Sequence, residues 1–407
     1  MPDPDCLTHL GLEQALEIVA AHATQHRLPV EAVDLANAHG RVLAEDIRAP
    51  HPLPPFDNSA MDGFGLRSVD LPAAGERTFE LIGDVFAGAT GGPEVGRGQC
   101  VRITTGAPIP AGVDTVVIKE NVTVEAGRVT VKGGEKAGAN VRRGGEDYAE
   151  GDLAFGSGTR LGAAQLAVLA ALGIARVHVR RLPRIAVIAT GNELVSAGQQ
   201  LGFGQIHESN AVMLSALARE TGARVVTQAV VHDDPEALRV ALLEAAADAD
   251  IIVTSGGVST GEADHLPRVL QVVGETHFHK LRLKPGMPTL FGQIGASLYF
   301  GLPGNPVASS VIFRVFVRFA LRAMLGVKAV GKPHRARLGT PLQKRHVRAE
   351  LTRCAVRTDE DGVLWAIPHA KQGSGMLRGL AETEALALLP EGTRDYRRGD
   401  VVTLWPE

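Results

Sequence analysis

The sequence predicts a multidomain protein of the α/β plus β class, with a doubly wound α/β domain, β-rich N-terminal domains and a small C-terminal β domain. Strands and helices alternate between residues 183 and 330, which is typical of a mostly parallel sheet covered by helices on both faces. Residues 50–142 instead contain short apolar runs separated by Gly- and Pro-rich turns, a pattern of β structure. Residues 331–407 return to short strands and turns.

The elements of the α/β domain follow from its apolar runs and helix-start signals. Strands are predicted at 185–189, 224–231, 250–253, 276–283 and 297–300. A helix is predicted to begin at Asn210, which can act as an N-cap. Further helices are predicted to begin at Asp234–Pro235 and at Asn305–Pro306, because an N-cap residue followed by proline favours a helix start. Nearer the N-terminus, residues 11–23 predict an amphipathic helix, 31–48 short strands and 161–172 an Ala/Leu-rich helix.

Composition excludes several classes of function. The net charge of −3 and an aromatic content of 4% give no basis for binding nucleic acid. Cys6, Cys100 and Cys354 are far apart, so they predict neither a disulfide framework nor a zinc site, and they suit a reducing cytoplasm. The N-terminus lacks the apolar core of a signal peptide. The apolar stretch 307–325 carries three arginines on one helical face, which predicts a packed helix and not a membrane span.

Three polar segments are predicted to meet at one edge of the sheet, because ligands in such sheets bind at the carboxyl ends of strands. They are Thr190–Glu193, the loop 254–264 and Gly301–Pro306. The loop 254–264 is the most informative, since its glycines and hydroxyl residues predict backbone N–H groups that cradle an anion; these are Ser255, Gly256, Gly257, Ser259, Thr260 and Gly261. The same loop contains Glu262 and Asp264, which repel phosphate unless a cation lies between them. An anionic ligand with a divalent metal is therefore expected.

Two further features have both a functional and a structural interpretation. Lys280, Arg282 and Lys284 alternate with leucines, so on a strand they share a face and form either an oxyanion clamp or a solvated edge. Gly304, Asn305 and Pro306 open a helix whose N-terminus favours an anion, although an ordinary capped helix explains them too.

Seven segments, in order along nearly the whole chain, resemble the molybdopterin molybdenumtransferase family, which is similar to the C-terminal domain of gephyrin. The matching segments are Phe56–Gly63 (FDNSAMDG), Arg102–Pro108 (RITTGAP), Gly145–Asp147, Thr190–Leu194 (TGNEL), Ser255–Ser259 with Gly261–Asp264, Lys284–Gly286 and Leu302–Pro306 (LPGNP).

The resemblance implies a four-domain, elongated homodimer. It divides the chain into a linker and dimerisation domain (1–49 and 143–182), a β-rich domain that contributes to the partner's active site (50–142), a molybdopterin-binding domain (183–330) and a C-terminal β domain (331–407). The implied reaction joins adenylylated molybdopterin and molybdate, releases AMP and requires Mg²⁺ or a similar ion. Other cofactor-synthesis proteins and apo-molybdoenzymes are the implied further partners.

Functional residues are carried over from the family motif by motif. The catalytic positions implied are Asp62, Thr105, Asp147, Glu193, Asp233, Lys280 and Lys284. The ligand-binding positions implied are Pro303, Pro306 and Ser374, in addition to Gly304, Asn305 and the anion cradle. Glu193, Asp264 and Asp62 are expected to hold Mg²⁺, because hard oxygen ligands suit this ion. Two positions depart from the family pattern, in which Asp is frequent at Asn192 and His is usual at Gly375.

Three alternatives remain open from the sequence. An adenylyltransferase acting one step earlier has a similar fold over 183–328 alone, but it does not explain the N-terminal section with Asp62 and Thr105. Tungstate is a tetrahedral dianion of similar size to molybdate, so the sequence does not separate the two. A receptor-clustering scaffold, as in gephyrin, belongs to a different class of function, and the sequence shows no linker or extra partner domain that would favour it. Loss of cofactor formation in folded Asp264→Ala or Lys284→Ala dimers would favour the enzyme.

Overall fold

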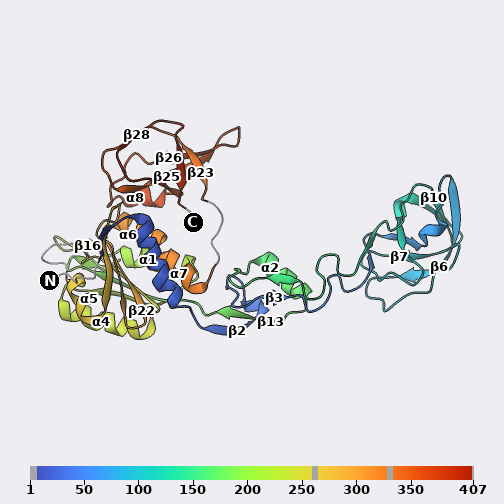
Figure 1. Cartoon of the computed structure of the whole chain (residues 1–407), viewed down its shortest axis with the longest axis horizontal. Helices are drawn as coiled ribbons and strands as arrows, with labels where there is room; N and C mark the ends of the chain where they lie inside the picture. Colours follow the sequence, from blue (N-terminus) through green and yellow to red (C-terminus); the bar gives the residue numbers. More distant parts are fainter. Residues whose placement is uncertain (1–6, 259–264, 328–332, 406–407) are drawn as a thin grey trace.

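The protein is elongated, with its α/β domain and its β-rich domain at opposite ends (Figure 1). The computed structural model describes residues 7–258, 265–327 and 333–405. The C-terminal domain lies against the α/β domain, and a small unit containing helix α2 separates the α/β domain from the β-rich domain.

A seven-stranded sheet forms the centre of the α/β domain. Its order is β1 (Leu7–Leu10), β19 (Glu275–Leu281), β21 (Leu290–Ile294), β22 (Ser297–Leu302), β18 (Ile251–Ser255), β14 (Arg184–Thr190) and β17 (Arg224–Val231). Strand β21 pairs antiparallel with both its neighbours, and the other pairs are parallel. The prediction of a mostly parallel sheet is confirmed.

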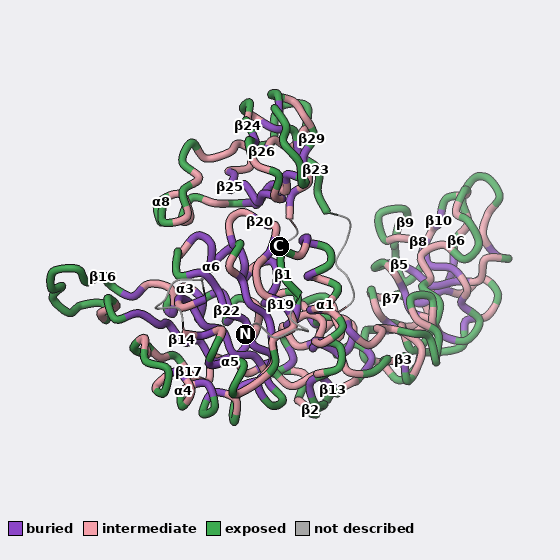
Figure 2. Tube along the Cα trace, turned by 60° about the vertical axis from the view of Figure 1, so that its left-hand side comes forward, coloured by how far each residue is buried: buried purple, intermediate pink, exposed green. Residues whose placement is uncertain are grey.

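Both faces of this sheet are covered, as its apolar strands predicted. Side chains alternate along β14, so that Ile185, Val187 and Ala189 pack in one core and Ala186 and Ile188 in the other. The first core also receives α1 (Leu12–Gln25), α3 (Asn210–Glu220) and a long helix made of α6 (Pro306–Ile312), a π-helical segment η4 (Phe313–Val317) and α7 (Arg318–Leu325). The second core lies under α4 (Pro235–Asp248) and α5 (Leu266–Val273). Figure 2 shows buried chain concentrated in this sheet.

The first strand and helix belong to this α/β domain, although the sequence-based division places residues 1–49 in the linker domain. Strand β1 pairs with β19, and Leu12, Ala15 and Val19 lie in the first core of the α/β domain. The 3.6-residue pattern of α1 predicts one apolar face but contains no information about which domain covers it.

The small unit between the two ends is built from two short strand pairs and a helix. Strand β2 (Val30–Asp34) pairs with β13 (Arg176–Arg180), and β3 (Ile47–Arg48) pairs with β12 (Leu153–Phe155), beside α2 (Ala163–Ala171) and a 3₁₀ turn, η1 (Leu35–Asn37). Its own core consists of Ala38, Leu43, Leu161, Leu169, Val177 and Val179. The two halves of this unit come from either side of the β-rich domain in sequence.

The β-rich domain contains a six-stranded sheet. Its order is β8 (Thr115–Ile118), β5 (Gly63–Leu66), β7 (Gln99–Ile103), β6 (Glu76–Val85), β10 (Arg128–Lys132) and β9 (Val122–Glu125), with 3₁₀ turns η2 (Ser68–Asp70) and η3 (Lys119–Asn121). The chain enters the domain at β4 (Asn58–Ser59) and leaves it at β11 (Val141–Arg142), and these two short strands pair with each other.

The C-terminal domain is a small barrel. Strands β25 (Ala349–Thr358), β26 (Leu364–Pro368), β23 (Arg335–Leu338), β29 (Val401–Leu404) and β27 (Ala385–Leu389) pair in that order, and β27 closes on β25. Strands β24 (Leu342–Lys344) and β28 (Arg394–Tyr396) form a side pair, and α8 (Leu377–Ala381) precedes β27. Strand β20 (Leu283–Lys284) leaves the α/β domain to pair with β25. None of the helices within the described ranges has the length and apolarity that crossing a membrane requires.

Candidate active site

The register of three adjacent strands brings the predicted loops together. Ala189 of β14 is opposite Ser255 of β18, and Ser255 is opposite Leu302 of β22. The segments that follow these residues therefore leave the sheet side by side and line a pocket of about 540 Å³. The predicted residues in this first lobe are Glu193, Asp233, Ser255, Gly256, Gly257, Pro303, Gly304, Asn305 and Pro306. The predicted convergence is confirmed.

Gly256 is required by the close approach of two loops. Its φ is +102°, and a Cβ atom there would lie 2.4 Å from the carbonyl oxygen of Thr190. Any side chain would push the loop after β18 away from the end of β14. Gly256 thus sets the spacing of two walls of the pocket.

A hydrogen-bond network centred on Asn210 and Ser255 ties the other two walls together. Asn210 Nδ2 donates to Ser255 Oγ at 2.8 Å and to the Gly304 carbonyl oxygen at 2.6 Å. Ser255 Oγ, which is almost fully buried, donates onward to the Pro303 carbonyl oxygen at 3.3 Å. Asn210 was predicted only as a helix start, so its second role between the loops was missed.

Asp233 is held at the pocket wall by groups from the neighbouring strand end. The Thr190 hydroxyl donates to Asp233 Oδ1, and the Asp233 N–H donates to Asn192 Oδ1 at 3.2 Å. Asn192 needs only a side-chain oxygen for this contact, so asparagine can serve where the family often has aspartate.

Glu208 is a lining carboxylate that the sequence analysis did not identify. It is 7% exposed, it lines the first lobe, and its Oε1 accepts from the Ala211 N–H at 2.6 Å. The sequence did contain one signal for this residue: Glu208 lies just before the helix start predicted at Asn210, where acidic residues commonly stabilise the helix N-terminus.

A second lobe of about 540 Å³ adjoins the first and shares Pro288, Pro303 and Asn305 with it. Lys284 and Ser374 line this second lobe. The Val307 N–H, in the first turn of α6, donates to the Ser374 carbonyl oxygen at 3.1 Å. The C-terminal barrel therefore supplies one wall of the cleft, and one of the free N–H groups predicted for this helix start is already used.

Arg353 organises the loop that carries Ser374. It is 1% exposed, and its guanidinium donates to the carbonyl oxygens of Lys371, Gly373 and Met376 at 3.0–3.2 Å. Arg353 lies in β25, and no pattern in the sequence of this strand predicts its role. A Cβ at Gly375 would lie 3.9 Å from Asn305 Oδ1, so this position borders the cleft.

The predicted row of three cations is wrong. Strand β19 ends at Leu281, and Lys280 has a φ of +72°, so the alternation of an extended strand is broken. Arg282 pairs with Glu391 at 3.0 Å and lies away from both lobes. Lys284 lines the second lobe, with its Nζ 3.3 Å from Glu350 Oε1, whereas Lys280 lines neither lobe.

The expected metal ligands are separated in the structure. Glu193 lines the first lobe, whereas Asp62 belongs to the β-rich domain at the opposite end (Figure 1). Asp264, together with Ser259 and Gly261, lies outside the described residues. Within the described ranges, no group of three or more His, Cys, Asp or Glu side chains is arranged to hold a metal ion.

Asp62 and Thr105 form their own small site in the β-rich domain. Asp62 Oδ1 accepts from the Thr105 N–H and from the Thr105 hydroxyl, each at 2.9 Å, and Lys119 Nζ lies 3.6 Å from Oδ2. These contacts, the backbone N–H first, lower the pKa of the Asp62 carboxyl. Asp147 lies in the chain that returns from this domain, where its N–H donates to the Leu53 carbonyl oxygen.

Comparisons with known proteins agree along the chain. The family model described as "MoeA N-terminal region (domain I and II)" matches residues 10–173, "Probable molybdopterin binding domain" matches 186–323, and "MoeA C-terminal region (domain IV)" matches 335–406. The solved structure of the molybdopterin biosynthesis MoeA protein of Pyrococcus horikoshii OT3 is similar with a TM-score of 0.83 at 30% identity. That match covers 98% of this chain and 100% of that chain.

Curated relatives extend the match to sequence. The molybdopterin molybdenumtransferases of Haemophilus influenzae and Bacillus subtilis are each 36% identical to this chain, over 379 and 384 residues. These matches cover 92% and 91% of this chain and 93% and 88% of the relatives. With this identity across all its domains, the chain belongs to the molybdopterin molybdenumtransferase (MoeA) family.

Proposed function

We propose that this protein is a molybdopterin molybdenumtransferase that inserts molybdate into adenylylated molybdopterin and releases AMP to give molybdenum cofactor. The observation that carries this proposal is the two-lobed cleft at the carboxyl ends of β14, β18 and β22. The cleft combines backbone N–H groups for an anion with carboxylates for a cation, as cleavage of a pyrophosphate link requires.

Each wall of the cleft has a proposed task. The backbone N–H group of Gly257 donates to phosphate oxygens, whereas the Gly256 N–H already donates to the Leu302 carbonyl oxygen at 3.1 Å and, with the Ser255–Asn210 network, keeps that loop in position. Lys284 supplies a positive charge to the oxyanion in the second lobe, where Ser374 also lies. Asp233 and Glu193 line the first lobe. Lys280 borders neither lobe, so we assign it no contact with the substrates.

Magnesium fits the carboxylates proposed to hold it. The lowered pKa of Asp62 keeps this side chain ionised, which is the form that binds Mg²⁺. We propose Glu193, Asp264 and the partner subunit's Asp62 as the ligands. When bound, the ion supplies charge neutralisation to the phosphate oxygens.

A homodimer explains why Asp62 and Thr105 lie at the far end of the chain from the cleft. In a two-fold dimer, the β-rich domain of one subunit contributes to the cleft of the other. The thiols Cys100 and Cys354 are free, which is consistent with the reducing cytoplasm that we propose as its location. Apo-molybdoenzymes are the proposed recipients of the product.

The direct test combines protein, adenylylated molybdopterin, molybdate and Mg²⁺, and measures AMP release together with reconstitution of an apo-molybdoenzyme. We expect AMP release to depend on molybdate. AMP release that is absent, or equal with and without molybdate, contradicts the proposed reaction.

Mixed dimers test the shared cleft. Asp62→Asn and Asp233→Asn homodimers should each be inactive, but heterodimers of the two contain one intact cleft, so random reassortment should restore about a quarter of wild-type activity. The matched control mixes Asp233→Asn with Glu193→Gln, which alter the same wall and should not complement. Recovery in the control, or none in the test, contradicts a cleft built across subunits.

A further inference from the structure

The loop that follows β18 packs against the sheet at Val258. This residue lines the first lobe, yet it is 2% exposed and belongs to the second core of the α/β domain. A Cβ atom at Gly301 of β22 would lie 2.7 Å from Val258 Cγ1, so the glycine leaves the space that the Val258 side chain fills. The loop therefore lies over β22, on the face of the sheet that α4 and α5 cover.

His279 holds the carbonyl group of the same residue. Its Nε2 lies 2.9 Å from the Val258 carbonyl oxygen, and because a carbonyl oxygen only accepts hydrogen bonds, Nε2 carries the hydrogen. The register explains how a residue of β19 reaches this loop. Gly301 is opposite Leu290 of β21, and Leu290 is opposite His279. Residues directly opposite each other point to the same face of a sheet, so the His279 ring lies on the face where Val258 packs.

We propose that His279 is a positioning residue for the phosphate-binding loop and keeps the Gly257 N–H directed into the first lobe. This inference rests on the proposed function. Gly257 lines the lobe with a φ of +64°, and it has no side chain that could hold it in place. The residue before it is fixed by the hydrogen bond from the Gly256 N–H to the Leu302 carbonyl oxygen. The His279 contact fixes the residue after it.

A loop held on both sides of its glycine is ordered before the substrate arrives. Binding then does not have to supply the free energy for ordering the loop. Without the His279 contact this cost falls on substrate binding, so the affinity for the phosphate-bearing substrate decreases. The rate of the bound complex changes less, because the lost contact affects the ground state and the transition state alike.

Steady-state AMP release with matched substitutions of His279 tests this role. His279→Leu removes the donor, so the KM for adenylylated molybdopterin should rise about tenfold while kcat changes less than about twofold. His279→Gln can place an amide N–H near the position of Nε2, and its KM should stay within about threefold of the wild-type value. A loss of folded enzyme would instead lower kcat at constant KM. An unchanged KM in His279→Leu, or an equal rise in both variants, overturns the proposal.

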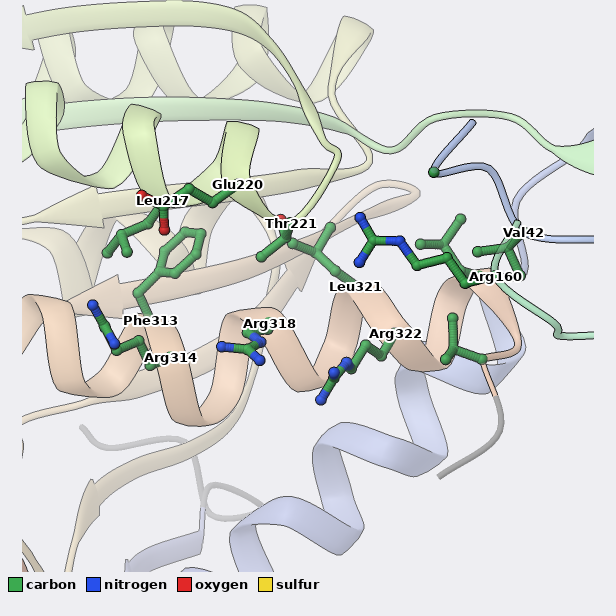
Figure 3. A pocket seen from close by; sticks show the side chains of 13 residues that line it. Val42, Arg160, Leu217, Glu220, Thr221, Phe313, Arg314, Arg318, Leu321 and Arg322 are labelled. Atoms are coloured by element: carbon green, nitrogen blue, oxygen red, sulfur yellow. The ribbon is translucent and has the colours of Figure 1, made fainter. Parts of the chain in front are cut away.

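Thr221→Val is the control for the loss of a comparable hydrogen bond elsewhere in the α/β domain. Thr221 Oγ1 donates to the Ala218 carbonyl oxygen at 2.7 Å. Its side chain lines a separate cavity of about 330 Å³ between α3 and α7 (Figure 3), which shares no lining residue with either lobe of the cleft. The KM of Thr221→Val should equal that of the wild type. An equal rise of KM in this control would overturn a specific role for His279.

Hydrogen–deuterium exchange of the substrate-free protein separates this inference from the proposed reaction. Residues 255–258 should exchange faster in His279→Leu than in the wild type or His279→Gln, whatever reaction the protein catalyses. If the wild type releases no AMP, the proposed function fails, and the exchange alone decides whether His279 anchors the loop. Unchanged exchange in folded His279→Leu overturns the proposal. Should His279→Leu not fold, His279→Asn replaces it with the same expected results, because its amide is too short to reach Val258.

Discussion

Lys284 and Glu350 are partners in the parallel pairing of β20 with β25, and their side chains form an ion pair with Nζ 3.3 Å from Oε1. Because β20 belongs to the α/β domain and β25 to the C-terminal barrel, one residue pair joins the two domains at the second lobe of the cleft. Glu350 is buried and also contacts His346 Nε2 at 2.9 Å. The cation proposed for the oxyanion is therefore positioned by the barrel.

A double-mutant cycle on this pair should give a small but measurable coupling energy. With Lys284→Met, Glu350→Gln and the double variant, we expect about 0.5–1 kcal/mol in urea unfolding, since the Lys284 side chain is 41% exposed and solvent screens the pair. Glu350→Gln alone should cost more than Lys284→Met, because it also disturbs the buried His346 contact. A coupling indistinguishable from zero would mean that this ion pair does not help to hold the two domains together.

The strands that position the cleft were predictable because local signals determine them. The continuous apolar runs of β14 and β18 identify strands covered on both faces, and the carboxyl ends of parallel strands must meet at one edge. The row of cations failed because the alternation of Lys280, Arg282 and Lys284 assumes an extended chain, and the positive φ of Lys280 ends it.

Long-range partners were not predictable for a different reason. Arg353 donates to three carbonyl oxygens of the loop 371–376, and α1 packs on a domain more than 150 residues away in sequence. These contacts depend on which distant elements pack together. Local signals in the sequence, such as hydrophobic periodicity or a helix cap, do not indicate this. The place of Asp62 relative to the cleft likewise depends on a second subunit in the proposed dimer.

Two adjacent aspartates should give opposite results. Asp233 lines the first lobe and accepts from the Thr190 hydroxyl, so Asp233→Asn should lower the rate of molybdate-dependent AMP release at least about tenfold, as expected for loss of a charged contact. Asp234 caps α4 by accepting from the Ala237 N–H at 2.8 Å. Asp234→Ala should therefore cost about 1 kcal/mol of stability and leave the rate of the folded enzyme unchanged. Equal loss of rate in both variants would contradict the assignment of Asp233.

Thr105 should control the ionisation of Asp62. The Thr105→Val variant removes the hydroxyl donor but keeps the backbone N–H, which is the largest cause of the lowered pKa. The pKa of Asp62 should rise in this variant but stay below its ordinary value, measured by carbon-13 NMR titration of the carboxyl group. The acidic limb of the rate profile should move to higher pH in the same direction. Asp57 serves as the internal control, because Gly144 and Arg143 hold its pKa low; a shift of both carboxyls would indicate a general disturbance of the domain.

His277 should make the protein less stable in mild acid. Its ring stacks on that of His22 with centroids 3.7 Å apart, and burial, followed by the charges of His22 and His26, lowers its pKa from 6.5 to about 4. Between these two pH values the unfolded chain binds a proton at this position that the folded protein does not bind, so stability falls as the pH decreases from 6.5 to about 4. Below pH 4 both states are protonated and His277 causes no further loss. His277→Gln should flatten the dependence of unfolding free energy on pH in this window, whereas His334→Gln, which alters an exposed histidine, should not. An equal slope in the wild type and His277→Gln would show that other groups govern the acid sensitivity.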